Sequence, residues 1–241
     1  MKDISTIRVL NQAGTYLYDP RGEVIRDVNL VNEGLESAFV YGDFFDAKTK
    51  LENEGFDVIS AEATARLRII NASEVIPWGH IVREAFIYVP KKGVYLTKES
   101  PIIKYPEEAR HCKQEPKESG VYVTKFFLTD GQVEEALADS VRIRMSKKQS
   151  SGTMQRGTKI STGRFKENEI TTYLFGKYAY EYGYFLEGRG IHSYRPWLIE
   201  PRDDRPFAVQ LEFRGPGNGG DLLDHGDHDL SSVCIRGIRR V

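Results

Sequence analysis

A run of basic residues between Val141 and Lys166 has the clearest chemistry in the sequence. No acid occurs between Asp139 and Glu167, and Ser, Gly and Thr fill much of the space between the cations. Clustered cations release counterions when they bind phosphates, so such a segment suits a nucleic-acid backbone; a solvated surface loop is the alternative. The predicted phosphate-binding residues are Arg142, Arg144, Lys147, Lys148, Arg156, Lys159, Arg164 and Lys166.

An aromatic tract follows the basic run directly. Tyr178, Tyr180, Tyr182 and Tyr184 repeat at every second residue, so one unbroken strand would carry all four on one face. Unstacked bases bind to aromatic side chains, but aromatic residues also dominate sheet packing and protein interfaces, and packing is favoured here. The residues predicted to make stacking or interface contacts are Tyr178, Tyr182, Arg189 and Trp197.

An Asp- and His-rich stretch, DLLDHGDHD at 221–229, is the third candidate. Carboxylates and imidazoles bind divalent metals, and the weak candidate ligands are Asp224, His225, Asp227 and His228. His225-Gly-Asp227 matches the first two ligands of a two-His, one-carboxylate iron site, but no His follows His228. An incidental polar loop is therefore favoured. No cofactor is predicted, and a divalent metal is the alternative.

Catalytic motifs are missing from the sequence. It contains no GxSxG, no P-loop Lys-Ser/Thr pair and no GxGxxG after a predicted strand. The balance therefore favours a protein that is not an enzyme, and no catalytic residue is predicted.

Strands are expected to position most of these groups. The hydrophobic patterns predict them at 7–10, 15–18, 24–30, 35–41, 63–71, 81–89, 94–97, 121–129, 140–145, 207–213 and 230–239. The segment 169–186 is expected to form two strands bent at Gly176 or Gly183. A helix is expected at 132–138. The segment 43–55 is ambiguous: it would form either a weak helix that Gly55 ends or a strand. The predicted fold is mainly β, or α+β with few short helices, with antiparallel sheets.

Length and composition set the domain organisation. The chain has 241 residues, of which 40% are hydrophobic, so it can build a sizeable core. We expect a single β-rich domain over 1–241; the alternative is two lobes, 1–97 and 121–241, joined by a Pro- and charge-rich loop at 98–120. The formal net charge is -1, so affinity for RNA must come from local charge segregation. Two distant cysteines and an N-terminus without an apolar stretch predict a cytoplasmic protein with no membrane partner.

Short pieces near the C-terminus carry a resemblance to a known family. They are Tyr173-Leu-Phe-Gly176, Glu187-Gly-Arg-Gly-Ile191 leading to Pro196-Trp197, Ala208–Phe213, and Asp224-His-Gly-Asp227 before Ser232–Val241. In these pieces the chain resembles a small accessory (Csx-type) subunit of type III CRISPR effector operons. The resemblance implies a non-catalytic subunit that sits on a multi-subunit, RNA-guided complex and serves antiviral defence.

Three functions are consistent with these observations. The leading hypothesis is a non-catalytic RNA- and protein-binding accessory subunit of a CRISPR-type ribonucleoprotein, with guide or target RNA and the other subunits as partners. The second is a metal-dependent nuclease or hydrolase that uses the stretch 221–229. The third is a structural phage or assembly protein whose tyrosine face forms an oligomer interface.

Overall fold

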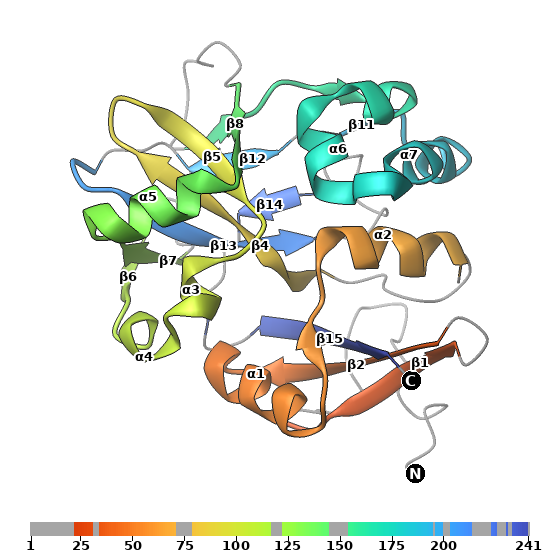
Figure 1. Ribbon diagram of the computed structural model, residues 1–241, viewed down its shortest axis with the longest axis horizontal. Helices are drawn as coiled ribbons and strands as arrows, with labels where there is room; N and C mark the ends of the chain where they lie inside the picture. Colours follow the sequence, from red (N-terminus) through yellow and green to blue (C-terminus); the bar gives the residue numbers. More distant parts are fainter. Residues whose placement is uncertain are drawn as a thin grey trace.

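A large mixed sheet with helices packed on both faces organises the chain (Figure 1). The computed structural model describes residues 22–30, 34–70, 79–116, 122–144, 154–194, 196–199, 203–213, 223–225, 230 and 233–240. The strands predicted at 7–10 and 15–18 lie outside these ranges. The fold class is α+β, which is the second of the two forms that the sequence predicted. No helix in the described ranges is long and apolar enough to cross a membrane.

The strands fall into one large sheet and two small ones. The large sheet contains β1 (Ile25–Leu30), β2 (Leu35–Gly42), β3 (Asp57–Val58), β4 (His80–Val89), β5 (Gly93–Thr97), β6 (Lys113–Pro116), β7 (Tyr122–Phe127), β8 (Ser140–Ile143), β13 (Phe207–Phe213), β14 (Leu223–His225) and β15 (Val233–Arg240). The small sheets pair β9 (Met154–Arg156) with β12 (Trp197–Ile199), and β10 (Ile160–Ser161) with β11 (Ser193–Tyr194).

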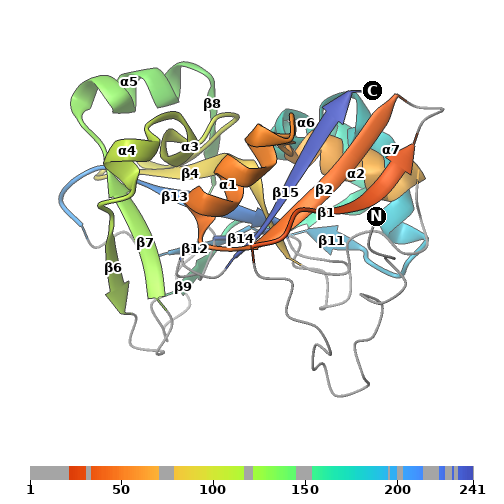
Figure 2. The ribbon, with the colours of Figure 1, turned by 90° about the horizontal axis from the view of Figure 1, so that it is seen from below.

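The last strand, β15, holds the centre of the large sheet together. It runs antiparallel to β2 along its whole length and parallel to β4 where Ile235 meets Ile81. The other pairings among the described strands are antiparallel, so the prediction of antiparallel sheets is wrong at this one pair. Figure 2 shows the resulting twist, with β6 and β7 at one end and β1, β2 and β15 steeply inclined at the other.

The helices are more numerous than the sequence predicted. They are α1 (Phe44–Asn53), α2 (Ala61–Ile70), α3 (Pro101–Lys104), α4 (Pro106–Ala109), α5 (Asp130–Ala138), α6 (Glu169–Phe175) and α7 (Ala179–Glu187), with the 3-10 helices η3 (Thr162–Glu167) and η4 (Gly176–Tyr178). The stretch 98–120, predicted as a loop, contains α3, α4 and β6.

The segment 43–55, for which the sequence left a weak helix and a strand open, forms the helix α1. The side chain of Asp43 accepts hydrogen bonds from the backbone N–H groups of Phe45 and Asp46, which caps the first turn. At the other end, Gly55 has a φ of 78°, and Phe56 N donates to Leu51 O at 3.0 Å. This is a Schellman ending, for which glycine is the favoured residue because it adopts a positive φ without strain.

The strand predicted at 63–71 is wrong, because this segment forms α2. Ser60 Oγ accepts from Ala63 N at 3.1 Å and so starts a helix that the alternating pattern did not reveal. The buried residues include Ala61, Thr64, Ala65 and Arg68, a helical spacing that places one face against the sheet.

The two strands predicted over 169–186 are also wrong, since the segment forms α6, η4 and α7. Asn168 Oδ1 accepts from Ile170 N at 3.0 Å and caps α6. In α7 the buried residues are Ala179, Tyr182, Gly183 and Leu186, which again have helical spacing. In α7, Tyr182 therefore faces the core while Tyr180 and Tyr184 face the solvent, and the period-2 tyrosines do not share one face of a strand.

Hydrophobic clusters bury both faces of the sheet. On one face, Val82 and Phe86 of β4 pack with side chains from α2, α6 and α7. On the other, Ile81 and Ile87 of the same strand pack with side chains from α1 and β2. A strand covered in this way contributes nearly all of its side chains to the core.

A bulge interrupts the pairing of β4 with β13. The register moves from Gln210 opposite Ala85 to Glu212 opposite Ile81, so β4 contains the extra residues. The buried amide of Gln210 donates to Glu84 O at 3.1 Å and accepts from Ser100 Oγ at 2.6 Å. A bulge re-aims side chains, and here it directs the side chain of Glu84 towards the start of α2, where it accepts from Ala61 N.

Candidate binding surface

Two of the predicted phosphate-binding residues lie at the β8 edge of the sheet. Among the described strands, β8 pairs only with β5. Val141 and Ile143 are buried, whereas Arg142 and Arg144 are exposed. The predicted alternation is confirmed, and it turns both guanidinium groups towards the solvent.

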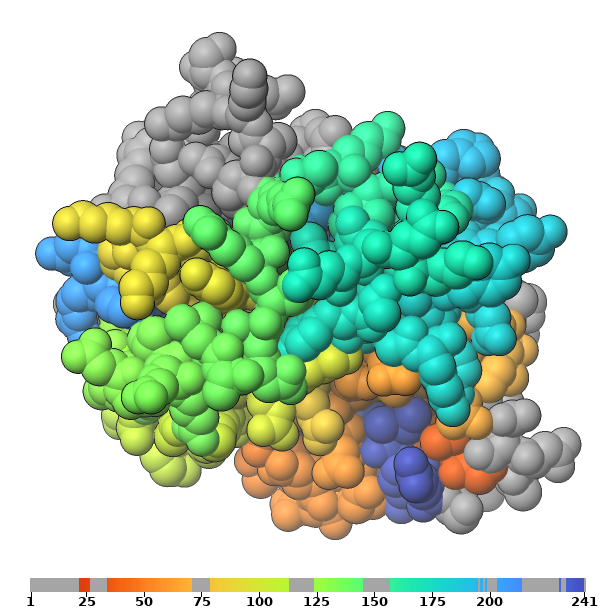
Figure 3. Space-filling view, turned by 45° about the horizontal axis from the view of Figure 1, so that its top comes forward, coloured from red at the N-terminus to blue at the C-terminus, as the bar shows by residue number. Residues whose placement is uncertain are grey.

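Three further predicted cations lie where the chain returns to this edge. Both the backbone N–H and the hydroxyl of Thr158 donate to Arg144 O at 3.0 Å, which brings Lys159 close to β8. Next along the chain, η3 exposes Arg164 and Lys166 while burying Phe165. We call the five residues Arg142, Arg144, Lys159, Arg164 and Lys166 the basic edge. Figure 3 shows the face on which β8 adjoins the segment that starts at residue 160.

The remaining three predicted cations cannot be assigned to this edge. Arg156 belongs to β9, whose backbone pairs it with Trp197 of β12, and both side chains lie outside the described part of the structure. Lys147 and Lys148 lie outside the described residues altogether. Their predicted contacts with phosphate stay predictions.

Within the described ranges, no carboxylate neutralises the basic edge. None of its five side chains forms an ion pair there. Elsewhere the pairing is close: Lys48 lies 2.7 Å from Glu52, and Lys125 lies 2.8 Å from Asp203. Exposed cations without a partner are available to an anionic ligand, for which charge-assisted hydrogen bonds are strong.

Tyr182 is a core residue and not a stacking residue. It is fully buried, and its hydroxyl accepts a hydrogen bond from Arg68 Nη1 at 2.8 Å. Burial raises the pKa of Tyr182 above its ordinary value, although the nearby Arg68 opposes the shift. The ring packs edge-on to Phe175, with 4.9 Å between the ring centroids. The prediction that Tyr182 contacts bases or a partner is therefore wrong.

The exposed tyrosines are two that the sequence reasoning did not select. Tyr180 is 56% exposed and Tyr184 is 72% exposed, one helical turn apart on the outer face of α7. Lys166 Nζ lies 5.0 Å from the centre of the Tyr180 ring and so joins the basic edge to this face. Helical spacing of Ala179, Tyr182, Gly183 and Leu186 was the signal in the sequence that would have identified them.

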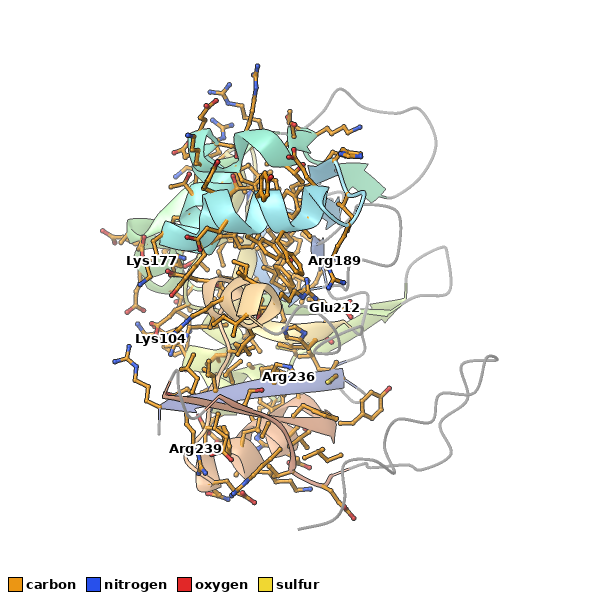
Figure 4. All side chains as sticks on the ribbon, turned by 90° about the vertical axis from the view of Figure 1, so that its right-hand side faces the viewer. Lys104, Lys177, Arg189, Glu212, Arg236 and Arg239 are labelled. Atoms are coloured by element: carbon orange, nitrogen blue, oxygen red, sulfur yellow. The ribbon has the colours of Figure 1, made fainter. Side chains whose placement is uncertain are left out.

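The ends of α7 are also cationic. Lys177 lies over the half-buried ring of Tyr178 at 5.1 Å, and Arg189 lies over Phe185 at 4.6 Å. Figure 4 shows Lys177 and Arg189 at opposite ends of this helix. Exposed Glu167, Glu169 and Glu181 intervene, so positive charge is concentrated along the basic edge and not along α7.

The predicted metal ligands are only partly described. Asp224 and His225 belong to β14, which pairs them with Glu212 and Leu211 of β13. Asp227 and His228 lie outside the described residues. In the ranges that are described, no group of three or more His, Cys, Asp and Glu side chains could hold a metal. The metal hypothesis for 221–229 stays a prediction.

Comparison with known proteins identifies the fold. No protein-family model matches this chain, and no curated protein matches it. The chain is similar to a solved structure described as "Accommodation of massive sequence variation in Nanoarchaeota by the C-type lectin fold". The two are 13% identical with a TM-score of 0.60, over 85% of this chain and 97% of that chain. At this identity, the similarity shows that the chain has the C-type lectin fold and shows nothing of its ligand.

Proposed function

We propose that this chain is a non-enzymatic binding protein whose basic edge holds the phosphates of a single-stranded RNA. The observation that carries the proposal is the set of five exposed cations without a carboxylate partner in the described part of the chain. Phosphate contacts supply most of the affinity of such complexes, and they need unpaired cations more than a high net positive charge.

The neighbouring tyrosines favour a single strand over a duplex. Bases of a single strand are free to stack on aromatic rings, whereas bases in a helix are already stacked. Lys166 lies over Tyr180, so a strand bound along the basic edge has exposed rings within reach at its η3 end. These contacts replace those that the sequence assigned to Tyr182.

The fold supports a binding role. The description of the similar structure states that the C-type lectin fold accommodates massive sequence variation in Nanoarchaeota. In this chain the exposed cations alternate with buried side chains, such as Val141, Ile143 and Phe165, that belong to the core. Surface substitutions along the edge are therefore compatible with an unchanged core.

The narrower proposal, an accessory subunit of a type III CRISPR complex, rests on the resemblance of the C-terminal motifs. Its test is the genomic neighbourhood together with co-purification. Adjacent effector genes and co-purification with their products support the narrower proposal. Neighbours of another kind leave RNA binding standing and remove the CRISPR assignment.

A salt titration tests the RNA proposal. A labelled single-stranded RNA should bind with a log–log salt slope of about -3.5 if all five cations engage, since each phosphate contact on a single strand contributes about -0.7. Affinity should therefore fall about 100-fold between about 50 and about 200 mM salt. Lys159→Gln and Arg144→Gln should each reduce the slope by about 0.7.

Lys48→Gln is the control, because it removes one partly buried cation that is already paired with Glu52. It should leave the slope unchanged. Affinity that does not depend on salt, or an equal loss in Lys48→Gln and Lys159→Gln, would contradict the proposal. Tight, salt-independent binding to another protein would instead assign the surface to protein docking.

A further inference from the structure

A polar cavity of about 400 Å³ lies between the start of α2, the end of β5, α3 and α5. Small-molecule sites have volumes of about 300 to 1,000 Å³, so this cavity is large enough for a small ligand. None of the residues of the basic edge lines it. Figure 4 shows Lys104 of α3, one of the lining residues, on the side of the molecule away from the label of Arg189.

The lining carries more negative than positive charge. Its cations are Arg83, Lys98 and Lys104. Its acids are Glu62, Glu84, Glu99, Glu135 and Asp139. Five carboxylates face three cations, which leaves an excess of two negative charges when all are ionised.

The cations of the cavity do not neutralise most of these acids. Lys104 and the hydroxyl of Tyr105 both donate to Glu135. Lys98 Nζ instead donates to the backbone oxygen of Leu174 at 3.3 Å and lies 5.0 Å from the centre of the Tyr173 ring.

Three acids that line the cavity are not held in a salt bridge in the described part of the chain. In the described part of the chain, Glu62, Glu99 and Asp139 form no ion pair. Each of them is therefore open to a positively charged ligand.

Beneath these acids lies a wholly buried carboxyl group. Glu84 is 0% exposed, and its two oxygens lie 3.1 and 2.9 Å from the single N–H of Ala61. The backbone N–H of Glu84 also interacts with this carboxylate, but no cation forms an ion pair with it among the described residues. When Glu84 is ionised, its negative potential adds to that of the other acids that line the cavity.

We propose that this cavity binds a small organic diamine, whose two ammonium groups pair with the acids Glu62, Glu99 and Asp139 along the wall. An ammonium carries three donors and no acceptor, which matches a wall of carboxylates. A metal ion fits less well, since no group of three or more His, Cys, Asp and Glu side chains within the described ranges is arranged to hold one. The site is separate from the basic edge, so it does not depend on RNA binding.

Ionisation of Glu84 makes the affinity of the cavity for an ammonium ion depend on pH. The groups that interact with the Glu84 carboxyl are Arg83, Lys98, Tyr173, Tyr194, the N–H at the start of α2 and the backbone N–H of Glu84 itself. Burial raises the pKa of Glu84 to about 7, while it raises the pKa values of both tyrosines, which stay neutral. Glu84 therefore gains its charge near neutral pH, and an ammonium ion binds more tightly above that point.

Calorimetry with putrescine tests the proposal, with butane-1,4-diol as the uncharged probe of the same length. The full chain should bind putrescine and not the diol. Asp139→Asn and Glu62→Gln should each weaken binding about tenfold, the scale of one lost charge-assisted contact. Glu134→Gln is the matched control, because Glu134 is exposed on α5 but does not line the cavity. It should bind like the wild type.

Binding measured at two pH values tests the proposal even if one of the variants folds poorly. Putrescine should bind the wild type more weakly at about pH 6 than at about pH 8, and Glu84→Gln should remove this difference. Absence of binding at both pH values, equal binding of the diol, or an equal loss in Glu134→Gln would overturn the proposal. So would tighter binding of inorganic phosphate than of putrescine.

Discussion

Replacing Glu84 by Gln isolates the cost of a buried charge in this fold. Glu84 is 0% exposed, and the amide oxygen of Gln can still accept from Ala61 N. Gln is nearly isosteric with the protonated acid and has no charge to desolvate. The variant therefore compares an ionisable side chain with a permanently neutral one at the same position.

The direction in which stability changes with pH follows from the raised pKa of Glu84. Burial moves the pKa of Glu84 from 4.5 to about 7, so between these values the folded state binds more proton than the unfolded state. The free energy of unfolding of the wild type then falls as pH rises through this window, and it levels off above about pH 7. A difference of about 2.5 between the two pKa values corresponds to about 3 kcal/mol at high pH.

Urea unfolding at several pH values measures this effect. Relative to the wild type, Glu84→Gln should be about 2.5 kcal/mol more favourable at about pH 8 than at about pH 5. Acetate and phosphate buffers are needed, because an amine buffer is itself a ligand of the proposed cavity. Glu134→Gln should show no such trend, since Glu134 is exposed. A difference between wild type and Glu84→Gln that is the same at both pH values would refute the reasoning.

Two further predictions concern the packing of α7, and urea unfolding measures both. Arg68→Met should destabilise the fold by about 2–4 kcal/mol, and Tyr182→Phe should destabilise it by about 1–2 kcal/mol. Each substitution removes one partner of the buried 2.8 Å hydrogen bond between the two side chains. Strictly additive losses in the double variant would show that the two residues are not coupled. Gly183→Ala should lower the free energy of unfolding by more than about 2 kcal/mol, since the added Cβ would lie 2.3 Å from a backbone oxygen of η3. At Gly188 the nearest atom to an added Cβ is 3.6 Å away, so Gly188→Ala should change the free energy of unfolding by no more than about 0.5 kcal/mol. Equal losses at the two glycines would contradict the close approach of α7 to η3.

Local signals explain which elements the sequence could predict. In α1, the cap at Asp43 and the glycine at Gly55 lie within the segment itself, and of the two forms that the sequence left open, helix and strand, they favour the helix. The alternation of β8 was equally local, and it correctly placed Arg142 and Arg144 on one side. In α2, the alternating pattern of Ala65, Leu67 and Ile69 was typical of a strand, but the cap at Ser60 and the contacts with α6 and α7 favour a helix.

Long-range features could not be predicted in the same way. The parallel contact of β15 with β4 joins residues 235 and 81, and no local pattern encodes such a pairing. Glu84 reaches the start of α2 only because a bulge re-aims it and Gln210, far along the chain, stabilises that bulge. The cavity that Glu84 lines could therefore not be predicted from the sequence, although each of its acidic residues can be read there.

Charge segregation links the two proposed sites in a chain whose formal net charge is only -1. Asp139 ends α5 and lines the cavity, whereas Arg142, three residues later, belongs to the basic edge. Both side chains are exposed, and salt screens interactions between exposed charges under physiological conditions. At physiological salt Asp139→Asn should therefore weaken putrescine binding and leave the RNA salt slope unchanged, while Arg142→Gln should do the reverse. A variant that impaired both sites equally would show that they form one site and not two.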